Sequence, residues 1–117
     1  KLVWGRLPML QTCAAHLKCK KNKNNLVWID MGGGTGYNVE EMDKYFSLNN
    51  FKKIYIVDLC PSLCEKARQR VIDKGWTNVE VICDDVCNFI PPERTAINII
   101  TFSSLIRNFK SPILSNL

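Results

Sequence analysis

Apolar residues recur at steps of three and four positions in three segments of the chain, and this spacing predicts an amphipathic helix in each. The first segment is 6–20, and the second is 39–46, which ends at the polar sequence SLNN. The third begins at Pro61, a residue suited to the first turn of a helix, and ends before Gly75, where a left-handed C-cap is expected.

Four short runs of large apolar residues lie between and after these helices. We interpret each as a buried strand: 26–31, 52–59, 78–83 and 96–102. Strands that alternate with helices are joined by right-handed crossovers into a parallel sheet. The sequence therefore predicts an α/β fold, a Rossmann-like doubly wound parallel sheet of which about four strands are present.

Ligands of such sheets bind beyond the carboxyl ends of the strands. This rule points to four stretches that lie far apart in the sequence: 30–36, 58–59, 84–87 and 103–104. We expect the fold to bring them to one edge of the sheet and to form a ligand site there.

The segment WIDMGGGTGYN, residues 28–38, places four glycines directly after the first predicted strand. Glycine permits positive φ and close approach of the backbone to a ligand, and a glycine turn between a strand and a helix is typical of nucleotide sites. A P-loop is excluded because no lysine follows the glycines, and a dinucleotide fingerprint lacks its third glycine, since that position is Tyr37. The pattern that remains is D-x-G-x-G-x-G, with the candidate cofactor-binding residues Asp30, Gly32, Gly33, Gly34, Thr35 and Gly36.

An acidic residue at the end of the second strand, about 20 residues beyond the glycines, typically binds the hydroxyls of a ribose. Asp58 takes this position, with Leu59 beside it. A carboxylate accepts hydrogen bonds from both hydroxyls at once, which is the physical reason for an acid there. Oxidoreductases that bind NAD use the same acid. Asp58 therefore predicts that a nucleoside is bound here, but it does not tell an NAD enzyme from an enzyme with another nucleoside cofactor.

Length and composition limit the number of domains and the kinds of segment that the chain can contain. With 117 residues, 46% apolar and 23% charged, the chain is one globular domain at most. It has no apolar run long enough for a transmembrane helix and no signal peptide. It starts with Lys1 and stops without a closing element, so we expect a fragment of a longer protein.

The net charge of +5 is concentrated in KCKKNKNN, residues 18–25. These lysines are typical of a solvated helix end and linker, and the alternative is a patch that touches anionic lipid headgroups as a peripheral membrane contact. Few aromatic residues interleave with the charges, so no nucleic-acid partner is expected.

Six cysteines form no C-x₂-C pair, and neither a zinc ribbon nor a redox motif is predicted; they stand at positions 13, 19, 60, 64, 83 and 87. We expect buried free thiols, a reducing compartment and no metal site.

The glycine turn followed by Asp58 resembles the first motifs of class I S-adenosylmethionine (SAM) dependent methyltransferases. In that family the turn passes under the amino-acid part of SAM, and an acid after the third strand accepts the adenine amino group. The resemblance gives this role to Asp85, rather than Asp84, in VICDDV, with the backbone N–H of Val86 facing the ring. Without a ligand role, the two acids would cap the start of a loop.

Over residues 3–103 the amino-acid sequence resembles the methyltransferase half of betaine-lipid synthase more closely still. WGRLPML…AAHLK, WIDMGGGTGYNVEEM, IYIVDLCPSLCEKARQRVIDKGWTNVEVICDD and ITFS carry this resemblance. It implies three N-methylations of the homoserine amine of a diacylglycerol-based lipid, diacylglyceryl-homoserine, with SAM as cofactor. It also implies an aminocarboxypropyltransferase domain as partner, in the same or a separate chain, at the cytosolic face of the endoplasmic reticulum membrane.

The same resemblance sets the expected domain limits. Residues 1–25 form a helix and basic linker, 26–103 a partial SAM-binding domain without its C-terminal strands, and 104–117 a divergent tail that we attribute to a truncation or a misread exon. Ser103, after the fourth strand, is the candidate on the substrate side, and the catalytic base is not identified. Cys60 stands where the family has an N-cap serine, so that cap is expected to be weak.

Three other interpretations stay open. One is another class I SAM methyltransferase of small molecules or lipids, one is a nucleotide-binding oxidoreductase, and one is a non-catalytic, truncated nucleotide-binding module. Cofactor preference separates the first two, and turnover of diacylglyceryl-homoserine separates the first from a betaine-lipid enzyme.

Overall fold

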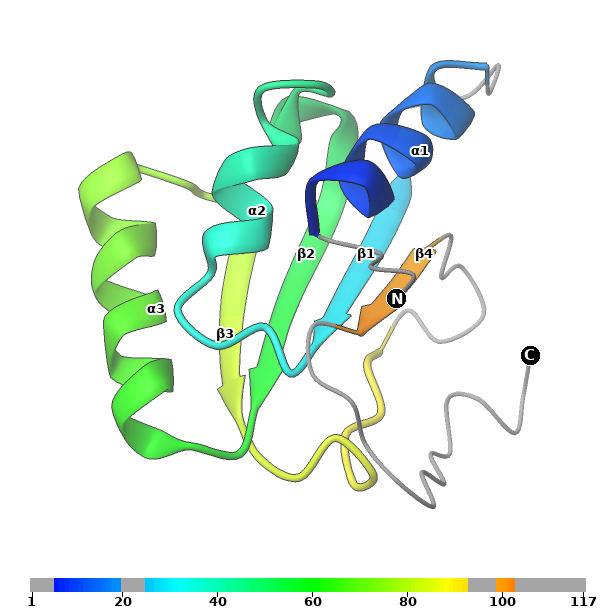
Figure 1. The fold of residues 1–117 in the computed structure, drawn as a ribbon. Helices are drawn as coiled ribbons and strands as arrows, with labels where there is room; N and C mark the ends of the chain where they lie inside the picture. Colours follow the sequence, from blue (N-terminus) through cyan, green and yellow to red (C-terminus); the bar gives the residue numbers. More distant parts are fainter. Residues whose placement is uncertain (1–5, 20–24, 93–98, 103–117) are drawn as a thin grey trace, which may run out of the picture.

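A computed structural model describes residues 6–19, 25–92 and 99–102. In these ranges the predicted elements follow one another in the predicted order (Figure 1): α1 (Arg6–Lys18), β1 (Leu26–Met31), α2 (Tyr37–Met42), β2 (Phe51–Asp58), α3 (Pro61–Lys74), β3 (Val79–Cys83) and β4 (Ile99–Phe102). A short 3₁₀ helix that was not predicted, η1 (Leu48–Asn50), precedes β2.

The four strands form one sheet in the order β3-β2-β1-β4, and all neighbouring strands are parallel. The predicted parallel α/β fold is therefore confirmed. The chain enters the sheet at β1, proceeds outward through β2 to β3, and then returns to the other side of β1. The strand order reverses between β1 and β4, and ligands of open α/β sheets bind at such a reversal.

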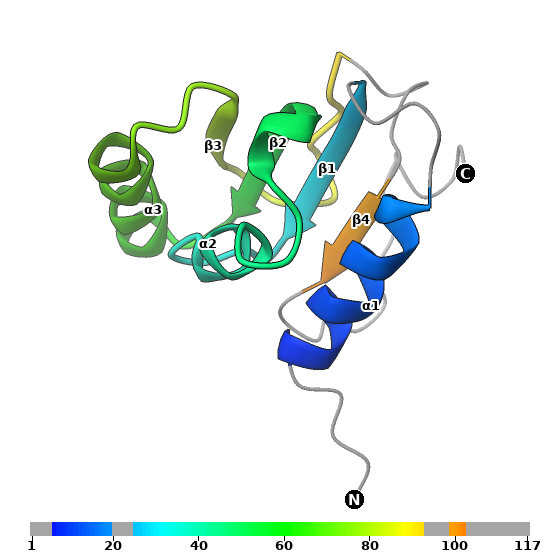
Figure 2. The same ribbon diagram turned by 90° about the horizontal axis from the view of Figure 1, so that it is seen from above.

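Two apolar clusters cover the two faces of the sheet. The three helices lie on one face, while the segment after β3 crosses the other (Figure 2). Trp28 and Ile54 pack toward the helices, whereas Ile29 and Tyr55 belong to the opposite cluster. All six residues of β1 are buried, as expected for a central parallel strand that is covered on both sides.

The second helix is shorter than predicted, because α2 ends at Met42 rather than near Phe46. The N–H of Tyr45 donates to the carbonyl of Met42 at 2.9 Å, which tightens the turn, and the carboxylate of Asp43 accepts from the N–H of Leu48 at 3.1 Å. Phe46 is nevertheless buried, with its ring edge-on to that of Phe51. The apolar spacing identified the core residue correctly but not the end of the helix.

The third helix begins and ends where the sequence predicted. Pro61 is its first residue, and Gly75 takes the left-handed C-cap conformation with φ 67°. The Cys60 side chain makes no capping hydrogen bond, which confirms the expected weak cap. Residues 96–98 of the predicted fourth strand, Ser103 and the tail 104–117 lie outside the described residues.

The prediction of buried thiols is correct for Cys64 alone. All six cysteines are free, but Cys19 and Cys83 are exposed and the other three are half-buried. Cys83 is exposed because it closes β3, which lies at one edge of the sheet.

Candidate functional site

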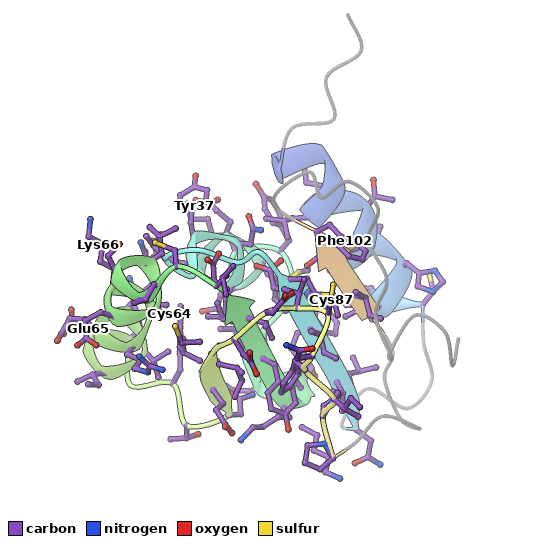
Figure 3. The ribbon with its side chains drawn as sticks, turned by 90° about the horizontal axis from the view of Figure 1, so that it is seen from below. Tyr37, Cys64, Glu65, Lys66, Cys87 and Phe102 are labelled. Atoms are coloured by element: carbon purple, nitrogen blue, oxygen red, sulfur yellow. The ribbon has the colours of Figure 1, made fainter. Side chains whose placement is uncertain are left out.

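Three of the four predicted stretches meet at the edge formed by the carboxyl ends of the strands, which Figure 3 views directly. The N–H of Gly34 donates to Oδ2 of Asp58 at 2.9 Å, and the N–H of Asp84 donates to the carbonyl of Asp58 at 3.0 Å. Asp58 therefore joins the glycine turn to the segment after β3. The fourth stretch, 103–104, lies outside the described residues, and the last described residue before it is Phe102 of β4, labelled in Figure 3.

The glycine turn lies directly on β2. The N–H groups of Gly32 and Gly33 both donate to the carbonyl of Val57, at 2.7 and 3.2 Å. A Cβ atom at Gly33 would lie 2.8 Å from Cγ2 of Ile56 and 2.9 Å from Oδ2 of Asp30, so no side chain fits there. Three further glycines have positive φ: Gly32 at 69°, Gly34 at 57° and Gly36 at 82°. The run of glycines thus brings bare backbone to the edge of the sheet.

Asp30 supports this turn from beneath. It is fully buried, and its carboxyl oxygens accept from Oγ1 of Thr101 at 2.6 Å and from Nδ2 of Asn38 at 3.2 Å. The indole Nε1 of Trp28 donates in turn to Oγ1 of Thr101 at 2.9 Å. The network ties β1, β4 and the start of α2 together under the glycines. A direct contact between Asp30 and a cofactor stays a prediction.

Asp58 is partly exposed at the edge, and both of its carboxylate oxygens are held by backbone. Oδ2 accepts from Gly34, and Oδ1 accepts from the N–H of Cys60 at 2.9 Å. A carboxylate has about four acceptor sites, so two such bonds leave capacity for two ligand hydroxyls. Leu59, which is 67% exposed, offers an apolar surface next to that carboxylate.

Asp84 and Asp85 cap the turn that follows β3. Oδ1 of Asp84 accepts from the N–H of Asp85 at 2.7 Å, and Oδ1 of Asp85 accepts from the N–H of Cys87 at 2.9 Å. The sequence predicted this local capping for the case in which the two acids bind no ligand. The side chain of Val86 is buried in the cluster on the second face, so only its backbone can meet a ligand. The adenine contacts of Asp85 and Val86 stay predictions.

Sequence reasoning missed three polar residues that hold the turn: Asn38, Thr101 and Arg70. Nε of Arg70 donates to the carbonyl of Thr35 at 2.8 Å, and its Nη1 donates to the carboxylate of Glu40. The hydrogen bond from Arg70 is the main cause that lowers the pKa of Glu40. A signal for Arg70 was present, because it is the last residue of the motif VDL-x-PSLCE-x-AR-x-R.

Two thiols near Asp58 differ in acidity. The hydrogen bond between Cys60 and Ser62 is the main cause that lowers the pKa of Cys60, whereas burial is the main cause that raises the pKa of Cys64 to about 12. Among the described residues, no group of three or more histidine, cysteine, aspartate or glutamate side chains is arranged to hold a metal ion. None of the helices in the described part of the chain is long and apolar enough to cross a bilayer.

Comparison with known proteins identifies a family whose profile matches most of the chain. The sequence profile of a family described as "Methyltransferase domain" matches residues 29–116. A search of curated proteins finds no significant match.

Several solved structures that share this fold are methyltransferases. The chain is similar to a SAM-dependent methyltransferase from Aquifex aeolicus, with 20% identity, a TM-score of 0.60, and coverage of 80% of this chain and 46% of that one. It is similar to an rRNA methylase from Streptococcus thermophilus, with 21% identity, a TM-score of 0.63, and coverage of 87% and 52%. A plantazolicin methyltransferase in complex with SAH (S-adenosylhomocysteine) matches at 21% identity and a TM-score of 0.55, over 74% of this chain and 31% of that one. The chain thus spans about half or less of these structures.

Proposed function

The chain belongs to the methyltransferase domain family, and we propose that it binds SAM at the carboxyl edge of its sheet and serves SAM-dependent methyl transfer. The observation that carries the proposal is the position of Asp58. Its carboxylate lies at the end of β2, against the N–H of Gly34 in the glycine turn. This is where an acid that binds a ribose is expected in such folds.

The residues at this edge fit a cofactor that combines a nucleoside with an amino acid. Asp58 offers acceptors to ribose hydroxyls, and the exposed Leu59 offers an apolar surface beside them. The glycine turn brings backbone rather than side chains to the neighbouring position, and Tyr37 stands where a dinucleotide fingerprint has its third glycine. These features favour SAM over a dinucleotide.

SAM supplies an activated methyl group on a sulfonium, so the protein needs to do little beyond positioning. In our proposal Asp58 orients the ribose, and the glycine turn lies against the amino-acid part. The buried hydrogen-bond network around Asp30 keeps that turn rigid, because the side chains of this network come from β1, β4 and α2. Asp85 and the backbone of Val86 bind the adenine. The acceptor amine must lose a proton, and Ser103 is the substrate-side candidate near that step.

We further propose that the methyl acceptor is the homoserine amine of a diacylglycerol-based lipid. The support is the motif VDL-x-PSLCE-x-AR-x-R followed by GW-x-NV, which resembles betaine-lipid synthase. The aminocarboxypropyltransferase partner and a location at the cytosolic face of the endoplasmic reticulum belong to this proposal. The basic segment 18–25 is the candidate for a peripheral contact with anionic headgroups.

Calorimetric titration of SAM, SAH and NAD into the chain tests the cofactor. We expect both adenosyl ligands to bind and NAD not to bind. Asp58→Asn keeps the shape of the side chain but removes its charge and one of its two acceptors of backbone N–H groups. It should weaken SAH binding by about tenfold or more, because hydrogen bonds to a charged group contribute about 1.5–3 kcal/mol. Asp73→Asn, an exposed acid of α3 bonded to Gln69, is the matched control. Binding of NAD alone, or equal effects of the two variants, would contradict the proposal.

The lipid substrate needs a separate assay. Transfer of labelled methyl groups from SAM to diacylglyceryl-homoserine in mixed micelles should give mono-, di- and trimethylated products in succession. SAM binding together with transfer to a different lipid or small molecule would retain the cofactor and refute the betaine-lipid substrate.

A further inference from the structure

We propose that Arg70 is a positioning residue that sets the geometry of the glycine turn and thereby the affinity for the amino-acid part of the cofactor. The inference rests on the proposed function and assigns a role to a side chain of α3. It starts from the contacts of one guanidinium with two separate segments.

Arg70 reaches from α3 to the turn and to the first residues of α2. Its Nε donates to the carbonyl of Thr35 at 2.8 Å, and its Nη2 lies 3.5 Å from Oγ1 of the same residue. Its Nη1 donates to Oε1 of Glu40, which Lys74 also approaches at 3.7 Å. One side chain therefore fixes a loop carbonyl and the following helix at the same time.

The turn is held from two sides as a result. On one side Asp58 accepts the N–H of Gly34, and on the other Arg70 donates to the carbonyl of Thr35, the next residue. Gly36 suits this turn because its φ is 82° and a Cβ there would lie only 3.1 Å from Cδ1 of Ile56, whereas Cδ of Arg70 would be in ordinary contact with that Cβ at 3.5 Å. The backbone between the two anchors is the part of the turn proposed to meet the cofactor.

An arginine suits this task better than a lysine. The planar guanidinium presents its N–H groups in a fixed fork, so three nitrogens can address Thr35 and Glu40 together. A lysine ammonium is a point charge on a flexible stem and can serve one partner well. Arg70 is only partly exposed, with 27% of its side-chain surface accessible, so its contacts are partly shielded from water.

Loss of this anchor should affect binding selectively. A turn that must be ordered on binding reduces affinity for whatever contacts it, because ordering costs conformational entropy. The amino-acid part of SAH contacts the turn in the proposed function, whereas 5′-methylthioadenosine has the same nucleoside and lacks that part. Arg70→Met should therefore discriminate between these two ligands.

The test is calorimetric titration of both ligands into the wild-type chain, Arg70→Met, Arg70→Lys and the control Arg68→Met. Arg68 lies on the same helix, its side chain is 46% exposed, and its Nη1 lies 3.9 Å from the carboxylate of Glu65. Its replacement by methionine removes the same charge as Arg70→Met. We expect Arg70→Met to weaken SAH about tenfold and methylthioadenosine less than twofold, Arg70→Lys to restore part of the loss, and Arg68→Met to change neither. Amide hydrogen exchange of the free protein should show faster exchange in residues 33–40 of Arg70→Met.

Other outcomes overturn the inference. Unchanged SAH binding in Arg70→Met would refute the positioning role and leave the proposed function intact. Equal losses for the two ligands, with faster exchange throughout the chain, would show a general structural role instead. A wild-type chain that binds neither ligand would refute the proposed function and this inference together.

Discussion

Thr101→Val removes one hydroxyl from the centre of the network that supports the glycine turn. Thr101 is 3% exposed, its Oγ1 donates to Asp30 at 2.6 Å, and it accepts from the indole of Trp28 at 2.9 Å. Valine has nearly the same shape, so the change tests the hydrogen bonds rather than the packing.

The expected cost follows from these contacts. Two hydrogen bonds are lost, each with a net contribution of about 1 kcal/mol, and a buried donor left without an acceptor adds about 1–3 kcal/mol. The indole of Trp28 has a single N–H and is fully buried, so it is that donor. We expect the free energy of unfolding to fall by about 3–5 kcal/mol, and the midpoint temperature by at least about 12 °C, since 1 kcal/mol corresponds to about 4–8 °C in a domain of this size.

Urea denaturation followed by circular dichroism measures the effect. Thr77→Val, at an exposed position before β3, is the control and should stay within about 0.5 kcal/mol of the wild type. The double variant Trp28→Phe with Thr101→Val has no indole N–H that could be left without an acceptor. Its free energy of unfolding should therefore fall by less than the sum of the two single-variant decreases, by about 1 kcal/mol or more. A loss below about 1 kcal/mol for Thr101→Val, or strict additivity in the double variant, would refute the reasoning.

Three further predictions concern the turn and the start of α3. Cys60→Ser should raise the free energy of unfolding by about 0.5–1 kcal/mol, because serine can cap the helix where Cys60 makes no capping bond; a loss of stability in urea would contradict this. Iodoacetamide should modify Cys60, whose pKa is lowered mainly by its hydrogen bond with Ser62, well before Cys64, whose pKa burial raises to about 12, and peptide mapping at pH 7 and pH 9 checks the order. Gly33→Ala should cost about 1–3 kcal/mol, because its Cβ would lie 2.8 Å from Ile56, and a loss too small to measure in urea would show that the turn is looser than described.

The sequence was sufficient for the features that depend on local chemistry. Runs of apolar residues predicted the strands. Pro61 and Gly75 predicted the two ends of α3, because proline and glycine act on the backbone wherever they stand. The glycine pattern and the acid after the second strand predicted a site at the carboxyl edge of the sheet, and the structure brings these residues together there. In a parallel sheet, strand ends come together whatever the intervening sequence, and the Gly34–Asp58 contact is an example.

Features that depend on distant partners could not be read from spacing. Thr101 and Asp30 are separated by 71 residues, and Arg70 and Thr35 by 35, so no local pattern reports either pair. The early end of α2 depends on the hydrogen bond from the N–H of Leu48 to the carboxylate of Asp43, which competes with helix propagation. Cys83 was misjudged because its burial depends on the position of its strand within the sheet, and β3 lies at an edge.

The most direct test of the proposed SAM site is a backbone amide ¹H–¹⁵N NMR titration of the chain with SAH. The account predicts saturable shifts in three separate segments at once: Gly32–Gly36, Asp58–Cys60 and Asp84–Cys87. Absence of shifts at saturating SAH, or shifts confined to residues away from the carboxyl edge of the sheet, would contradict it.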